Sequence, residues 1–216
     1  MPYFYSYFNA GTGDRTECTL TCNTCEEKKA DGSQCSLTSC IGTPFCWIHL
    51  LHKHHLRIKP SKIEGAGKGL FAIGSKEQRK APNDVVFKKD FHIINYGGEP
   101  INNATLQQRY PGKNLGPYVI RSGKGNKQQI EDAGCQRGVG SISNHVENGT
   151  HKEGPLKGKR VINAFINWNL STEVFDLIAY RDIHHGEEIF VNYGNTYKKD
   201  LTNNKIKHST RPQRKQ

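Results

Sequence analysis

The cysteines of this chain are concentrated in one short stretch, and this stretch most limits how the chain can fold. Six of the seven cysteines lie between residues 18 and 46, and the motif "FCWIH" then adds His49. About 40 residues cannot bury enough apolar surface to fold alone, so they need a metal, disulfides or a partner. The stretch therefore predicts a small module separate from the rest of the chain.

A metal site is favoured over disulfides in this module. The N-terminus "MPYFYSYFNAGTGDRTEC" lacks the basic and apolar regions of a secretory signal, and no run approaches the roughly 20 apolar residues of a membrane span. We therefore expect an intracellular protein that does not enter a membrane, with mostly reduced thiols. Clustered thiolates together with the close pair Cys46 and His49 suit a tetrahedral Zn²⁺ ion.

The segment "CEEKKADGSQCSLTSCIGTPFCWIH" resembles a small cysteine-rich module of bacteria, viruses and protists. That module has a Gly-Xaa-Xaa-Cys step, here "GSQC", and an aromatic-Cys-Trp-Xaa-His ending. The resemblance implies four zinc ligands, namely Cys25, Cys35, Cys46 and His49. The three surplus cysteines, Cys18, Cys22 and Cys40, are alternative ligands, a partial second site or unliganded thiols.

From about residue 57 the sequence changes to short apolar segments separated by glycines. "FHIINYGGEPI" (91–101), "VINAFINWN" (161–169) and the segment up to "EEIFVNYG" read as short strands, and "NNATLQQRY" (102–110) as a short helix with an asparagine cap. The pattern predicts a mainly β domain. The expected division is an N-terminal segment (1–17), a zinc module (18–56), a β domain (57–197) and a basic, disordered tail (198–216).

Four segments of this β domain occur in a recognisable order. "GAGKGLFA", "YGGEPI", "SNH" and "AYRDIHHGEEIFVNYG" together resemble the SET domain, the fold of S-adenosylmethionine-dependent protein lysine methyltransferases. The resemblance covers about residues 57–197. It implies several small curved β-sheets around a pseudo-knot, in which the Asn-His and Tyr-Gly segments thread together as a rare exception to unknotted folds.

The resemblance also assigns roles to individual residues. It implies that Tyr193 is the catalytic tyrosine, which aligns the lysine amine for an in-line methyl transfer. The implied cofactor-binding residues are Ala66, Lys68, Gly69, Tyr118, Asn144 and His145. The implied lining of the substrate channel is Tyr96, Val191 and Tyr197.

The sequence also departs from the usual SET pattern. Val146 and Glu147 follow the Asn-His pair where the family commonly has Ser-Cys, and Val191 replaces a larger aromatic residue. The smaller side chain leaves more room at the amine and favours higher methylation states. These departures keep open an alternative class, a catalytically inactive SET-like module that binds chromatin or nucleic acid.

The charge balance favours acidic or nucleic-acid-bound partners. Lys and Arg number 31 against 20 Asp and Glu, a net charge of +11, and the tail 198–216 carries seven Lys or Arg against one Asp. A soluble surface that is basic but binds no acidic partner would have the same net charge. Histone is the leading substrate and a non-histone protein the alternative. We expect a nuclear location in a eukaryote, and the host nucleus or cytoplasm for a viral protein.

Overall fold

The computed structural model describes most of the chain. The described residues are 2–8, 15–21, 23–39, 44–64, 66–80, 84–112, 116, 118–122, 128–136, 138–146, 149, 158 and 161–194, with backbone alone for the first two ranges. Among these residues, no helix has the length and hydropathy of a membrane span.

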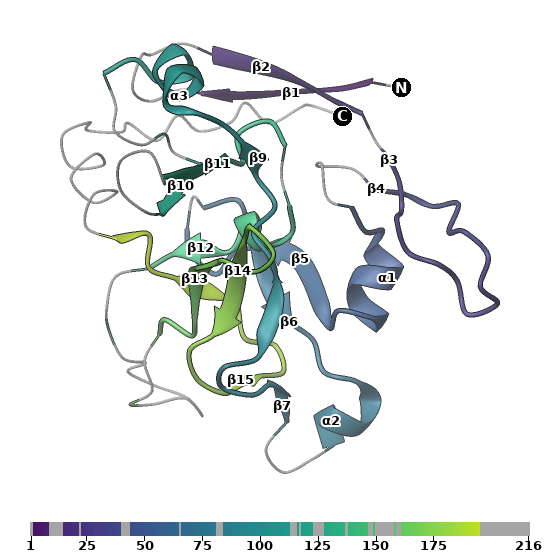
Figure 1. Ribbon diagram of the computed structural model, residues 1–216. Helices are drawn as coiled ribbons and strands as arrows, with labels where there is room; N and C mark the ends of the chain where they lie inside the picture. Colours follow the sequence, from purple (N-terminus) through teal and green to yellow (C-terminus); the bar gives the residue numbers. More distant parts are fainter. Residues whose placement is uncertain are drawn as a thin grey trace.

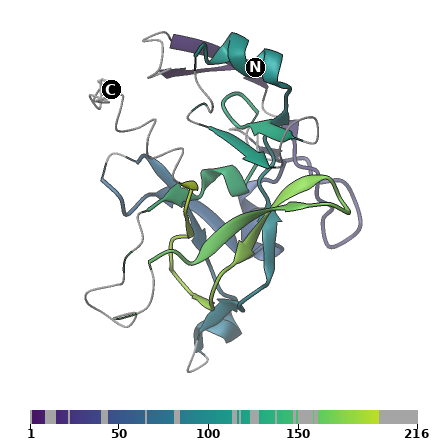
Figure 2. The ribbon, with the colours of Figure 1, turned by 60° about the vertical axis from the view of Figure 1, so that its left-hand side comes forward.

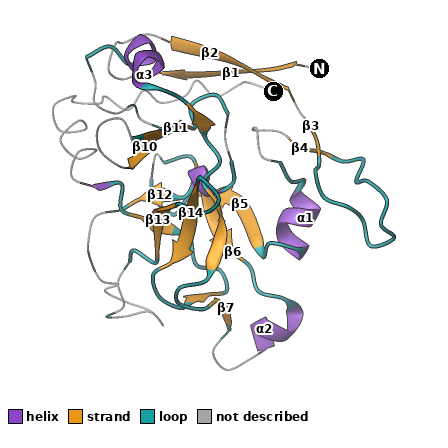
Figure 3. Cartoon of the chain, in the orientation of Figure 1, coloured by secondary structure: helices purple, strands orange, loops and turns teal. Residues whose placement is uncertain are grey.

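The described part is mainly β and consists of two- and three-stranded sheets, which confirms the predicted fold class (Figures 1 and 3). The strands before residue 80 are β1 (Pro2–Phe8), β2 (Arg15–Thr21), β3 (Asn23–Thr24), β4 (Thr38–Ser39), β5 (Leu56–Pro60) and β6 (Lys68–Ala72). The strands up to residue 132 are β7 (Val85–Phe87), β8 (His92–Asn95), β9 (Glu99–Pro100), β10 (Val119–Ser122) and β11 (Gln129–Asp132). The remaining strands are β12 (Asn144–His145), β13 (Ala164–Asn169), β14 (Val174–Ala179), β15 (Ile183–His184) and β16 (Phe190–Val191).

Helices are few and short. They are α1 (Trp47–His52), α2 (Lys76–Lys80) and α3 (Asn103–Arg109). The predicted helix over 102–110 is confirmed, because Asn102 caps α3 by accepting a hydrogen bond from the Thr105 N–H at 2.9 Å. Helix α2 lies outside the sequence prediction.

The main hydrophobic core lies between the hairpin β5–β6 and the three-stranded sheet β13–β14–β8. Its fully buried members include Leu56, Leu70, Leu177 and Ile183. Leu50 of α1 belongs to the same core, and α1 lies beside β5 in Figure 1. The cysteine-rich module is therefore packed onto the β domain.

A second, smaller core lies under α3. Leu106 and Tyr110 from the helix pack there with Val119 of β10 and Ile130 of β11. In the views of Figures 1 and 2, the hairpin β1–β2 lies next to α3. This hairpin occupies most of the N-terminal segment for which the sequence predicted no structure.

The pairing of β12 with β16 is parallel, whereas every other strand pair in the described ranges is antiparallel. Asn144 lies opposite Phe190, and His145 lies opposite Val191. Parallel strands need a long crossover, and here the chain passes through β13, β14 and β15 between them. The expected approach of the Asn-His segment to the Tyr-Gly segment is present. The strand predicted over 161–169 begins later, at Ala164.

A bidentate ion pair secures the turn before β16. The Arg181 guanidinium donates to Glu187 Oε1 at 3.0 Å and to Oε2 at 2.6 Å, and the His184 N–H donates to Oε1 at 2.8 Å. Burial alone would raise the pKa of the Glu187 carboxyl, but these donors outweigh it and lower the pKa. The ionised form of Glu187 therefore stabilises the folded state.

Glu187→Gln should lower the free energy of unfolding at pH 7 by about 3 kcal/mol, because it leaves the partly buried Arg181 guanidinium without its anion. A lowered pKa gives stability that is present above the unfolded value, ordinarily 4.5, and is lost as pH falls through the folded value. Urea unfolding of both proteins at several pH values measures this. The difference should shrink below pH 4.5, and a difference that stays constant would contradict the assignment.

Candidate functional site

Tyr193 is held at two of its polar atoms by the segment around β12. Its hydroxyl donates to the Ser143 carbonyl oxygen at 2.6 Å, and its N–H donates to His145 Nδ1 at 3.1 Å. The rings of His145 and Tyr193 are also stacked, with centroids 5.4 Å apart. Both the backbone and the ring of Tyr193 are therefore fixed by a segment distant in sequence.

The contact with Ser143 determines what the Tyr193 hydroxyl can offer a ligand. A carbonyl oxygen only accepts, so the hydroxyl proton points at Ser143. A hydroxyl that donates its proton can also act as an acceptor. Beyond Tyr193 the chain turns sharply, because the Gly194 N–H bonds Asn192 Oδ1 at 2.8 Å and Gly194 has a φ of +86°.

Asn144 joins β12 to the start of β6. Its Nδ2 donates to the Lys68 carbonyl and to Glu188 Oε1, each at 3.0 Å. Because both neighbours accept, the orientation of the amide is determined: nitrogen faces them and Oδ1 faces away. Asn144 therefore presents an acceptor beside the glycine-rich turn.

The glycine-rich turn connects β5 to β6 and is closed by its own backbone. The Ser61 N–H donates to the Gly67 carbonyl at 2.9 Å, and Gly67 has a φ of +74°, which favours glycine. Ala66 and Lys68 are exposed on this turn. Gly69 is required for another reason, because a Cβ there would lie 2.0 Å from Glu188 Oε1 and 3.2 Å from Asn144 Nδ2.

Of the predicted channel residues, Val191 lies close to Tyr193 along the chain, whereas Tyr96 packs in a separate cluster. Val191 is buried in β16, one residue away from Asn192 and two from Tyr193. Tyr96 is 2% exposed and packs in a separate cluster with Phe175, and its hydroxyl donates to the Tyr118 carbonyl at 3.0 Å. Tyr197 and Glu147 lie outside the described residues.

The Gly97-Gly98 turn after Tyr96 rests on a buried acid that the sequence did not reveal. Glu131 accepts from the Gly98 N–H at 3.0 Å and from the Phe175 N–H at 3.4 Å. Burial raises the pKa of this carboxyl, and the two backbone donors oppose the rise. Glu131 thus connects the Tyr96 segment to β14.

The four predicted metal ligands lie together in the cysteine-rich module. The Sγ atoms of Cys25, Cys35 and Cys46 and a ring nitrogen of His49 all lie within 4.8 Å of one another, and all four residues are buried. His49 Nδ1 is 3.4 Å from Cys25 Sγ and 3.3 Å from Cys46 Sγ. The side chains of Cys18, Cys22 and Cys40 lie outside the described residues.

These distances suit a tetrahedral zinc site. Bond lengths of about 2.3 Å to sulfur and 2.0–2.1 Å to nitrogen put tetrahedral ligand atoms roughly 3.5–3.8 Å apart. The observed separations of 3.3, 3.4 and 4.0 Å bracket this range. The Cys46 N–H also donates to Cys25 Sγ at 3.2 Å. The donor set fits zinc.

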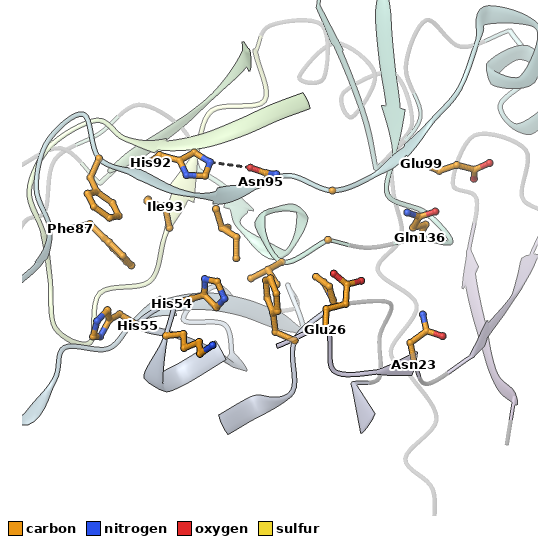
Figure 4. A pocket seen from close by; sticks show the side chains of 18 of the residues that line it. Asn23, Glu26, His54, His55, Phe87, His92, Ile93, Asn95, Glu99 and Gln136 are labelled. Carbon is orange, nitrogen blue, oxygen red and sulfur yellow. Dashed lines mark hydrogen bonds between the residues drawn. The ribbon is translucent and has the colours of Figure 1, made fainter. Parts of the chain in front are cut away.

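A cavity of about 960 Å³ lies between the cysteine-rich module and β8 (Figure 4). His54 and His55 line it from the module side, and His92 and Asn95 from β8. No residue predicted for the site lines it. Cys135, another lining residue, is disulfide-bonded and is an exception to the expected reduced thiols.

No protein-family profile and no curated protein match the sequence. Similar solved structures do exist. Polycomb repressive complex 2 of Chaetomium thermophilum, in complex with H3K27me3 and H3K27M, gives a TM-score of 0.46 at 21% identity over 65% of this chain and 14% of that chain. CpSET8 from Cryptosporidium gives 0.43 at 21% identity, over 68% and 62%.

A third similar structure is ATXR5 in complex with histone H3.1 mono-methylated on R26, with a TM-score of 0.45 at 14% identity over 64% of this chain and 56% of that chain. The structures that this chain resembles are SET-domain lysine methyltransferases. The chain spans less than two thirds of the length of each of these three. All three TM-scores are below 0.5.

Cys46→Ser should abolish binding of one zinc equivalent per chain, because it removes one of the four clustered ligands. Inductively coupled plasma mass spectrometry of the purified protein measures the metal content. Cys18→Ser is the matched control and should retain the zinc. Loss of zinc in the control but not in Cys46→Ser would overturn the ligand set.

Proposed function

We propose that this chain is an S-adenosylmethionine-dependent protein lysine methyltransferase. The observation that carries the proposal is the fixing of Tyr193 by the Ser143 carbonyl and by His145, the neighbour of Asn144 in β12. The order of the four sequence motifs supports the same activity. In this proposal residues 57–197 form the catalytic unit and residues 18–56 a zinc module, with 1–17 and the tail 198–216 outside both.

The cofactor site in this proposal consists of the glycine-rich turn and β12. The backbone around Ala66, Lys68 and Gly69, together with Asn144 and His145, would hold the cofactor. Tyr118 would contribute to the same site from β10. S-adenosylmethionine, when bound, supplies the methyl group that the amine attacks as the carbon–sulfur bond breaks.

Tyr193 positions the lysine for this reaction. A free lysine with a pKa near 10.4 is charged at neutral pH, and an apolar channel lowers that pKa because burial disfavours the cation. The Tyr193 oxygen accepts a hydrogen bond from the neutral amine, so the nitrogen lone pair is aligned with the methyl group. Tyr96, Val191 and Tyr197 line the channel that excludes water.

Histone is the proposed substrate class, and the proposed location is the nucleus. The proposed cofactors are S-adenosylmethionine and zinc. The net charge of +11 favours acidic assemblies such as chromatin, and the basic tail 198–216 is proposed to contact nucleic acid. Two of the similar structures were solved with histone H3 forms, which agrees with this choice. A non-histone protein is the alternative substrate.

Tyr193→Phe should lower the rate of methyl transfer by about 100-fold, because the amine loses the acceptor that orients it. The measurement is transfer of radiolabel from S-adenosylmethionine to core histones and to a whole-cell extract. Tyr180→Phe, in an exposed tyrosine outside the site, is the matched control and should retain activity.

Label only in extract proteins would move the substrate away from histones. An absence of label together with an absence of cofactor binding would favour the inactive SET-like binding module instead.

Val191→Phe should restrict the product to monomethyl-lysine, because the larger ring occupies the room that further methyl groups need. Mass spectrometry of the product after long reaction times shows the methylation state. The wild type should progress to dimethyl- or trimethyl-lysine. A wild-type enzyme that stops at monomethyl-lysine would show that Val191 does not set the methylation state.

A further inference from the structure

Glu188 is a buried carboxylate that the mechanism above leaves without a role. It is 2% exposed, and no ion pair among the described residues involves it. Ser61 Oγ donates to Oε1 and the Lys62 N–H donates to Oε2, each at 2.7 Å. Asn144 Nδ2 donates to Oε1 at 3.0 Å. The carboxylate therefore receives its hydrogen bonds from a turn and a strand that are distant in sequence.

All three partners of Glu188 are hydrogen-bond donors. The Lys62 N–H can only donate, and the Asn144 amide presents its nitrogen because the Lys68 carbonyl holds its other hydrogen. A glutamine at position 188 would keep the size of the side chain but present an NH₂ group to one of these donors. The site thus requires a carboxylate rather than a polar group of this size.

The position of Glu188 is fixed by its neighbours in the fold. Gly69 leaves the room for its Oε1 atom, which would otherwise meet a Cβ at 2.0 Å. On either side of Glu188, the Ala72 N–H bonds the Glu187 carbonyl and the Ile189 N–H bonds the Leu70 carbonyl, so its backbone is fixed against β6. The carboxylate cannot move without disturbing the segments that it joins.

We infer that Glu188 is a positioning residue for the cofactor site: its carboxylate sets the orientation of the Asn144 amide and the entry of the glycine-rich turn, and so the affinity for the cofactor. The inference rests on the proposed function. Without this acceptor, the Lys68 carbonyl alone would hold the Asn144 nitrogen. The amide, held by one acceptor instead of two, would then keep its Oδ1 less firmly oriented for the cofactor.

The test is Glu188→Gln, with binding of S-adenosylhomocysteine measured by isothermal titration calorimetry. We expect a dissociation constant about 10-fold higher, as for the loss of one hydrogen bond to a charged group. In steady-state kinetics the KM for S-adenosylmethionine should rise, while the KM for the protein substrate stays the same. Glu187→Gln is the matched control, because this neighbouring buried acid contacts Arg181, His184 and Asn163 instead.

The control separates positioning from general stability. Glu187→Gln should be destabilised yet bind S-adenosylhomocysteine with the wild-type affinity, whereas Glu188→Gln should bind weakly even well below its unfolding temperature. Equal affinities in Glu188→Gln and the wild type would overturn the inference and leave the proposed function standing. A wild type that fails to bind S-adenosylhomocysteine would overturn both.

Ser61→Ala provides a second variant in case Glu188→Gln does not fold. It removes the hydroxyl that donates to Oε1 and leaves the carboxylate in place. We expect the dissociation constant to rise about 3-fold, in line with one neutral donor to a charged acceptor. An unchanged affinity in Ser61→Ala would count against the positioning role.

Discussion

The parallel pairing of β12 with β16 is the constraint on which the site depends. It places Asn144 and His145 beside the strand that leads into Tyr193, although a long part of the chain lies between them. The contacts of Tyr193 with Ser143 and His145 exist only because of this pairing. Asn163 reinforces it, since its Oδ1 accepts from the Phe190 N–H at 2.8 Å. A buried polar network of this kind specifies one arrangement, because each group left unpaired would carry a desolvation cost.

The neighbouring acids Glu187 and Glu188 show how one short segment serves two purposes. Alternation along an extended chain directs the two side chains to opposite sides. Glu187 meets Arg181 and the turn before β16, whereas Glu188 meets the glycine-rich turn and Asn144. Folding stability and the geometry of the proposed cofactor site are thus maintained by adjacent but separate carboxylates.

The sequence predicted those features that local chemistry determines. Short apolar runs between glycines indicated a mainly β fold, Asn102 indicated the start of α3, and the ending "FCWIH" indicated two of the clustered metal ligands. The role of Glu188 escaped prediction because its partner Ser61 is 127 positions away. The contact of the Tyr96 hydroxyl with the Tyr118 carbonyl was hidden for the same reason. The hairpin β1–β2 was not predicted from the sequence.

The helix α1 carries a metal ligand and a core residue on consecutive positions. His49 belongs to the clustered ligands, and Leu50 enters the main core beside Leu56. A metal bound by these ligands would therefore also stabilise a helix that packs into the core of the β domain. In a cell, proteases act on the transiently opened fraction of a protein. The lifetime of the entire chain would then follow the local supply of zinc.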